Sequence, residues 1–141
     1  MVDLVIVGSI GLDDVKTPAG EVKSALGGST IYGATAASFF TRPGIVGIIG
    51  NDMPQEYKKY MEKFDCQGIT QKGKTFRWSG FYEGDMNGAT TIDTQLNAFA
   101  EFNGLLPEPY KQAKFLFLGN IQPELQSKVL SQMSNHPFVL M

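Results

Sequence analysis

The stretch LGGSTIYGATAASFFTRPGIVGIIGND, Leu26 to Asp52, decides the fold of this chain. A Gly-Gly pair precedes a segment rich in alanine and serine, which is typical of a helix that packs closely against a sheet. Arg42, Pro43 and Gly44 end that helix. The apolar run from Ile45 to Ile49 then has the composition of a strand that is buried on both faces. A helix followed by such a strand predicts a right-handed βαβ unit in a parallel sheet.

The same pattern continues on both sides of this stretch. Leu4 to Val7, Phe115 to Leu118 and Phe138 to Met141 are short apolar runs, which predict three further strands. Pro123 suits the first turn of a helix between the last two of them. The sequence therefore predicts an α/β fold in which helices sandwich a Rossmann-like parallel sheet.

Asp52 is predicted to cap the helix that follows it. Gln55 stands three residues later, as in a capping box, and apolar side chains recur at helical spacing from Met53 to Phe64. A role as N-cap explains Asp52 without any chemistry, and we favour it over a role as a ligand-binding carboxylate.

Two segments interrupt the α/β pattern. Val15 to Lys23 contains a Pro-Ala-Gly turn, and Thr75 to Asp93 contains the hairpin turn Asn87-Gly88. We predict that segments of about 12–25 and 72–94 form a small antiparallel sheet inserted into a domain that spans residues 1–141. At a period of two, Phe76, Trp78 and Tyr82 share one face of the second hairpin, and Arg77 and Ser79 share the other.

Composition excludes several classes of protein. The chain has 141 residues, 43% of them hydrophobic and 18% charged, which suits one soluble domain. Its net charge of −2, without a long basic run, argues against a nucleic-acid partner. No apolar stretch approaches the roughly 20 residues that cross a membrane, and the chain begins without a leader. Together with a single cysteine, Cys66, these features predict a cytoplasmic protein.

Polar groups that could bind a ligand follow the predicted strands. Asp13 and Asp14 come just after the first strand, at the edge where open α/β sheets bind ligands. A carboxylate there can accept hydrogen bonds from two neighbouring hydroxyls, although these residues alone favour the interpretation that both are solvated turn residues. Gly27-Gly28 would leave free backbone N–H groups at the start of a helix.

The run VIVGSIGLDD, Val5 to Asp14, followed by the Gly-Gly helix and by Gly50-Asn51-Asp52, resembles the N-terminal signature of the ribokinase-like (pfkB-type) carbohydrate kinases. The resemblance implies that Asp13 binds sugar hydroxyls and that Gly27 and Gly28 let the substrate lie against the main chain.

The chain departs from the family at two positions. Gly11 stands where many members have a polar residue, and Tyr32 stands where many have an asparagine. We expect Tyr32 to contact the substrate, but these departures leave the identity of the sugar or nucleoside open. Asn120, which follows the strand from Phe115 to Leu118, could reach the substrate or cap the next helix, and we favour the cap.

The inserted sheet resembles the family's lid. The lid residues Phe76, Arg77 and Trp78 would cover the substrate or mediate a homodimer, and the resemblance does not separate these roles. Arg77 could bind a phosphate or a hydroxyl, although an exposed strand arginine is usually solvated.

The resemblance implies transfer of the γ-phosphoryl group of ATP to a substrate hydroxyl with Mg²⁺. The family's Gly-Ala-Gly-Asp motif, which carries the catalytic base, does not occur in this sequence, where Gly84-Asp85 comes nearest. We therefore expect the truncated N-terminal half of a kinase, without the ATP-binding half and inactive alone.

The alternative is a non-catalytic small-molecule-binding or dimerisation module. Neither Cys66 nor His136 has neighbours in the sequence that suggest a metal site or a nucleophile.

Overall fold

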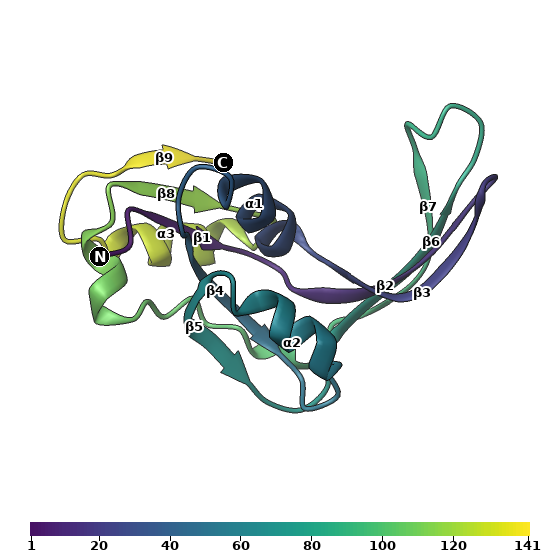
Figure 1. The fold of residues 1–141 in the computed structure, drawn as a ribbon, viewed down its shortest axis with the longest axis horizontal. Coiled ribbons are helices and arrows are strands. Elements are labelled where there is room, and N and C mark those ends of the chain that lie inside the picture. Colours follow the sequence, from purple (N-terminus) through teal and green to yellow (C-terminus); the bar gives the residue numbers. More distant parts are fainter.

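The structure is a computed structural model that describes all of residues 1–141. Its centre is a five-stranded parallel sheet with the strand order β5-β4-β1-β8-β9 (Figure 1). The strands of this main sheet are β1 (Leu4–Val7), β4 (Gly44–Ile49), β5 (Asp65–Gln71), β8 (Phe115–Leu118) and β9 (Phe138–Leu140). The helices are α1 (Ser29–Ala37), α2 (Gln55–Met61) and α3 (Pro123–Ser131), with the 3₁₀ helices η1 (Asn97–Glu101) and η2 (Glu108–Gln112).

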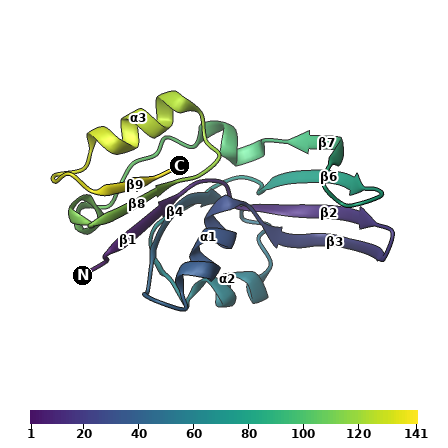
Figure 2. The ribbon, with the colours of Figure 1, turned by 90° about the horizontal axis from the view of Figure 1, so that it is seen from above.

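Helices cover both faces of the main sheet (Figure 2). On one face, Ile31 of α1 and Met61 of α2 pack with Ile45 of β4 in a buried cluster. On the other, Val129 of α3 and Tyr110 of η2 pack in a second cluster. Buried apolar residues on alternate sides of the central strands β1 and β4 thus contribute to two cores, as the predicted sandwich requires.

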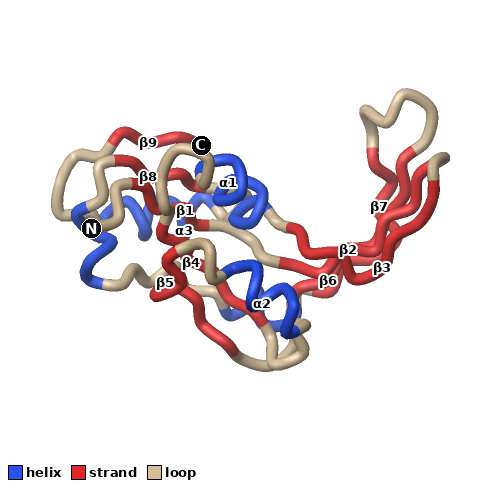
Figure 3. Tube along the Cα trace, in the orientation of Figure 1, coloured by secondary structure: helices blue, strands red, loops and turns tan.

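A second, four-stranded sheet projects from the main body and curves toward the side on which α1 lies (Figures 1 and 3). Its order is β3-β2-β6-β7, with β2 (Gly11–Thr17), β3 (Gly20–Gly27), β6 (Phe76–Tyr82) and β7 (Ala89–Gln95). We call it the accessory sheet. The two outer pairs are antiparallel hairpins, as predicted, but the sheet as a whole is mixed and not antiparallel. The central pair β2–β6 is parallel, because each is the first strand of its hairpin and leads outward from the main body (Figure 1).

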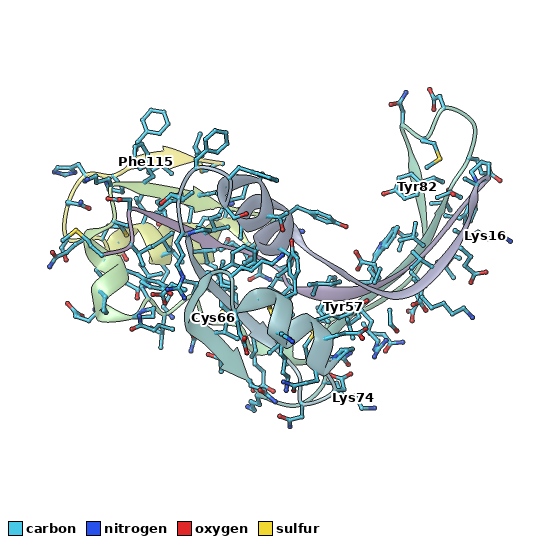
Figure 4. The ribbon with its side chains drawn as sticks, in the orientation of Figure 1. Lys16, Tyr57, Cys66, Lys74, Tyr82 and Phe115 are labelled. Carbon is cyan, nitrogen blue, oxygen red and sulfur yellow. The ribbon has the colours of Figure 1, made fainter.

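The accessory sheet has a concave face and an opposite face, and they carry different side chains. Side chains of paired residues lie on the same face, so Asp13 shares a face with Trp78, and Leu12 shares the other with Arg77. Figure 4 shows Tyr82 on the concave side and Lys16 on the opposite side. We call the face of Asp13, Trp78 and Tyr82 the inner face, and the other the outer face.

The strands predicted from apolar runs are confirmed, but β5 was missed. Asp65–Gln71 contains Gly68 and several polar residues, and only its central part is buried, because it lies at an edge of the main sheet. Such a strand lacks the apolar run that identifies a buried one. No helix of the structure combines the length and the apolar character that crossing a membrane would need.

The predicted capping role of Asp52 is wrong. Helix α2 begins at Gln55 with Pro54 in the N-cap position, and no side chain caps it. The Asp52 carboxylate accepts hydrogen bonds from the backbone N–H of Thr75 at 2.7 Å and from its hydroxyl at 2.9 Å. Asp52 therefore bonds to Thr75, 23 residues later in the sequence, and not to the first turn of α2 as the local pattern predicted.

Candidate functional site

The candidate site lies where the carboxyl ends of the main-sheet strands meet the accessory sheet. Strand β4, the next strand of the main sheet after β1, pairs with one edge of β1, and β8 pairs with the other edge. Open α/β sheets bind their ligands beyond the carboxyl ends of the strands where the strand order reverses in this way, and we call this place at the end of β1 the crevice. Gly8, Gly28 and Asn120 stand at this crevice, because each lies at the end of β1, the start of α1 or the end of β8.

Asp13 lies on the inner face of β2, half buried, with its carboxylate over Gly27 of the paired strand. A Cβ atom at Gly27 would collide with that carboxylate, so any larger residue would displace the Asp13 side chain. Burial, and then the neighbouring charge of Asp14, raise the pKa of Asp13. No protein hydrogen bond offsets these two effects. The carboxylate is thus free to accept hydrogen bonds from a ligand.

Gly28 joins β3 to α1 in a conformation that only glycine adopts readily. Its φ is +101°, and a Cβ atom there would collide with the carbonyl oxygen of Ser9. The main chain can therefore turn sharply from the accessory sheet into the first turn of α1, beside Asp13.

Tyr32 stands in the first turn of α1 and is 65% exposed. Partial burial, then the charges of Asp13 and of Tyr82, raise the pKa of its phenol. These influences show that Tyr32 lies near the inner face of the accessory sheet, on which Tyr82 also stands (Figure 4). Helix α1 and Asp13 therefore lie on the same side of the accessory sheet, toward which that sheet curves (Figure 1).

Asn120 belongs to a polar cluster that the sequence did not reveal. Its side-chain oxygen accepts hydrogen bonds from the hydroxyls of Ser9 at 2.8 Å and Ser29 at 2.5 Å. The Ser29 backbone N–H donates in turn to the Ser9 hydroxyl at 3.2 Å. The favoured capping role of Asn120 is wrong, because Gln122 occupies the N-cap position of α3.

The cluster ties the ends of β1 and β8 to the start of α1. Glycines at positions 8 and 119 make room for the Ser29 hydroxyl, since a Cβ atom at either would collide with it. Ser9 and Ser29 were missed because serine is common in loops, and only the crossover order of the strands brings them to Asn120.

The aromatic residues of the inner face have separate surroundings. The Phe76 ring lies over Gly11, where a Cβ atom would approach it to 2.7 Å, and packs against Phe99 with ring centroids 5.4 Å apart. Trp78 donates a hydrogen bond from its indole nitrogen to the Thr91 hydroxyl at 3.1 Å. Phe76 thus lies at the base of the accessory sheet beside the candidate site, whereas the Trp78 side chain is hydrogen-bonded to the neighbouring strand β7.

Arg77 lies on the outer face, away from Asp13. It donates hydrogen bonds to Ser24 Oγ at 3.2 Å and to the Asp52 carboxylate at 3.3 Å. Burial alone would raise the pKa of Asp52, but hydrogen bonds from Thr75 and Arg77 outweigh it, and the pKa lies below its usual value. These contacts join the end of β4 to the accessory sheet.

The nearest match to the missing catalytic motif, Gly84-Asp85, has only local contacts. Asp85 lies exposed in the β6–β7 turn and accepts hydrogen bonds from Asn87. The structure contains no group of three or more acidic, histidine or cysteine side chains that could hold a metal ion.

No family model matches the chain. A cytidine kinase of Thermococcus kodakarensis is 28% identical over 137 residues, which are 94% of this chain and 49% of that kinase. A nucleoside kinase of Methanocaldococcus jannaschii, described as an archaeal member of the ribokinase family, superposes with a TM-score of 0.76 at 15% identity, over 98% of this chain and 51% of the other.

The ribokinase of Thermotoga maritima superposes with a TM-score of 0.72 at 20% identity, over 99% of this chain and 52% of the other. This chain has the ribokinase-type fold. The resemblance to the N-terminal half of ribokinase-like kinases, predicted from the sequence, is thereby confirmed. The chain spans about half the length of the relatives that it matches.

Proposed function

We propose that this chain is the substrate-binding half of a kinase that transfers the γ-phosphoryl group of ATP to a hydroxyl of a sugar or nucleoside. The Asp13 carboxylate carries the proposal: it lies at the crevice beyond β1, half buried, over a glycine and without a protein donor. An acceptor in such surroundings suits two neighbouring hydroxyls, which donate hydrogen bonds and restore its lost solvation.

The other groups at the crevice would orient the substrate. Asn120 uses its oxygen for Ser9 and Ser29, which fixes the side chain, and its amide N–H groups remain to donate to a hydroxyl. Tyr32 would contact the substrate from α1, and the inner face of the accessory sheet would act as a lid that excludes water. Because Arg77 is engaged with Asp52 on the outer face, we leave it out of the substrate site.

The proposal assigns the substrate, and neither ATP nor Mg²⁺, to the residues of this chain. No cluster of metal-binding side chains is present, and the Gly-Ala-Gly-Asp motif of the family is missing from the sequence. Without that base, we expect the chain to bind its substrate and to transfer no phosphoryl group by itself. The alternative of a non-catalytic binding module predicts the same binding, so activity has to be tested after binding.

Thermal unfolding with added ligands tests the proposal. A ligand that binds the folded state at 100 times its Kd should stabilise it by about 2.7 kcal/mol. We expect at least one sugar or nucleoside from a panel to raise the midpoint of the wild-type chain, and Asp13→Asn to abolish that rise. The Asp14→Asn variant is the control, because Asp14 lies on the outer face and accepts a hydrogen bond from the Ser24 backbone N–H.

Two results would contradict the proposal. One is that no member of the panel raises the midpoint. The other is that Asp14→Asn abolishes the rise as completely as Asp13→Asn does.

A further inference from the structure

A groove of about 560 Å³ lies between α1 and α2, which cover the same face of the main sheet (Figure 2). Its lining contains three of the five tyrosines of the chain, Tyr32, Tyr57 and Tyr60. The Tyr60 hydroxyl is hydrogen-bonded to the Thr35 hydroxyl at 2.9 Å, which ties the two walls of the groove together. A mostly apolar, aromatic groove of this size can hold a small molecule.

The groove is distinct from the proposed substrate site at Asp13. Leu26, which lines the groove, pairs with Leu12 on the outer face of the accessory sheet, whereas Asp13 stands on the inner face. Tyr32 is the one lining residue that the crevice also claims, because its phenol lies near enough to Asp13 to feel that charge. A ligand in the groove would therefore lie on the opposite side of β2 and β3 from the substrate.

The tyrosine rings of the groove suit a cation. The Lys63 ammonium lies 4.2 Å from the centroid of the Tyr60 ring, so one of the three rings already holds an ammonium group. Lys63 does not line the groove, and no cation of the protein lies over Tyr32 or Tyr57. Because the quadrupole of an aromatic ring attracts a cation above its face, these two rings are open to a cation from outside.

Glu56 places a negative charge at the margin of the groove. Its carboxylate forms no ion pair, although Lys59 stands one helical turn later on α2. A cation held between the helices would have this carboxylate as its counter-ion, and the attraction would add to that of the tyrosine rings.

The lining selects one class of cation. A metal ion needs several oxygen or nitrogen ligands, and the groove offers a single carboxylate. A bare ammonium ion is strongly hydrated, and aliphatic side chains such as Leu26 and Ile31 cannot replace its water. An alkylated ammonium group carries its charge on an apolar surface, so tyrosine rings can both desolvate and attract it.

We propose that the groove between α1 and α2 binds a small organic cation with an alkylated ammonium group. The cation lies against the rings of Tyr57 and Tyr32, and the Glu56 carboxylate balances its charge. This second binding site goes beyond the function proposed above and does not rest on it.

Calorimetric titration of the 141-residue chain with choline and with 3,3-dimethyl-1-butanol, its uncharged isostere, tests the inference at constant ionic strength. We expect the wild type to bind choline about tenfold more tightly than the alcohol, because the two molecules differ chiefly in charge. Glu56→Gln removes the counter-ion, and Tyr57→Leu replaces an aromatic face by an aliphatic one, so each should abolish most of this preference. Glu56 is exposed, so that Glu56→Gln keeps the test decisive if Tyr57→Leu does not fold.

The controls are Glu62→Gln, an exposed acid at the C-cap of α2, and Phe39→Leu, an aromatic side chain that is 82% exposed just after α1. Neither residue lines the groove, and both variants should keep the preference for choline. Equal wild-type affinities for choline and the alcohol would overturn the inference, as would the absence of choline binding.

Two further results would also overturn it. If Glu62→Gln weakens choline as much as Glu56→Gln does, choline responds only to the overall charge of the protein. If Asp13→Asn weakens choline and Glu56→Gln does not, the cation lies at the crevice and not in the groove. Since neither probe is a sugar or a nucleoside, failure of the inference would leave the proposed function to its own test.

Discussion

Single aspartates near the crevice differ sharply in their surroundings. Asp13 is half buried without a protein donor, and its pKa is raised, whereas Asp52 accepts several hydrogen bonds, and its pKa is lowered. Asp14 accepts a backbone hydrogen bond at 2.7 Å. A carboxylate that the fold leaves unsatisfied at a ligand-binding edge indicates function, whereas a satisfied one indicates structure.

The raised pKa of Asp13 predicts that this residue destabilises the free protein at neutral pH. Because its folded-state pKa is above the ordinary value of 3.8, ionisation of this carboxylate opposes folding: the cost appears as the pH rises through 3.8 and is complete above the folded-state pKa. We expect Asp13→Asn to raise the free energy of unfolding at pH 7, and the gain to vanish near pH 3, where the aspartate is protonated. Urea denaturation at both values measures this.

Asp14→Ala is the matched contrast, because it removes the acceptor for the Ser24 N–H and should lower stability at pH 7. If Asp13→Asn is no more stable than the wild type at pH 7, then the ionised Asp13 carboxylate does not destabilise the folded protein, and the prediction is wrong.

Gly28 is the backbone position at which the site depends most on glycine. Gly28→Ala would place a side chain at a φ of +101° and against the Ser9 carbonyl, so we expect a loss of about 2–4 kcal/mol. Gly88→Ala is the control, since no atom lies near its Cβ position and its φ is not positive. Comparable midpoints of thermal unfolding for the two variants would show that the turn tolerates a side chain.

At the scale of elements, one polar network joins the end of β4 to the start of β6. The Thr75 hydroxyl accepts a hydrogen bond from the Gly50 backbone N–H at 2.9 Å and donates one to Asp52, which also pairs with Arg77. Thr75 is fully buried, and its carbonyl oxygen accepts a hydrogen bond from Asn97. This network fixes the direction in which the accessory sheet leaves the main body.

We expect Asp52 and Arg77 to be energetically coupled. A double-mutant cycle with Asp52→Asn and Arg77→Gln should give about 0.5–1 kcal/mol, because both side chains are roughly one-third exposed. The folded-state pKa of Asp52 is lowered, so its contribution is present above the unfolded-state value and is lost as the pH falls through the folded-state value.

Urea denaturation of the four proteins at pH 7 and at pH 2 measures this coupling. A coupling energy that persists unchanged at pH 2 would show that it does not arise from the ionised carboxylate. The exposed pair of Lys111 and Glu108, within η2, serves as a comparison outside the network.

The elements predicted from sequence are those whose signals are local. Apolar runs identified β1, β4, β8 and β9, and the Gly-Gly pair located the start of α1. Asp52 was misread because a capping box depends on nearby residues, whereas its actual partners lie in and beside β6, across the join between the two sheets. At the candidate site, Asp13 and Gly28 were predicted, but the contacts of Asn120 with Ser9 and Ser29 were not, because they depend on the strand order.

At the scale of the whole molecule, one part of the main sheet is uncovered. Phe115 and Phe138 are paired neighbours on β8 and β9, with ring centroids 6.3 Å apart, and they are 45% and 64% exposed. Their neighbours Leu116 and Val139 point to the opposite side, where they pack into the core that includes Val129 of α3. An apolar face beside an edge strand is a preferred surface for association.

We therefore expect the 141-residue chain to self-associate through Phe115 and Phe138, and not through the accessory sheet. Sedimentation velocity over a range of concentrations should show assemblies that the double variant Phe115→Ser/Phe138→Ser shifts toward monomer. Ile92→Ser on β7 is the matched control, because Ile92 is 68% exposed at the edge of the accessory sheet. If Ile92→Ser dissociates the assemblies and the double variant does not, the accessory sheet is the contact, as in the lid-mediated homodimer considered from the sequence. A chain that stays monomeric at every concentration would contradict both arrangements.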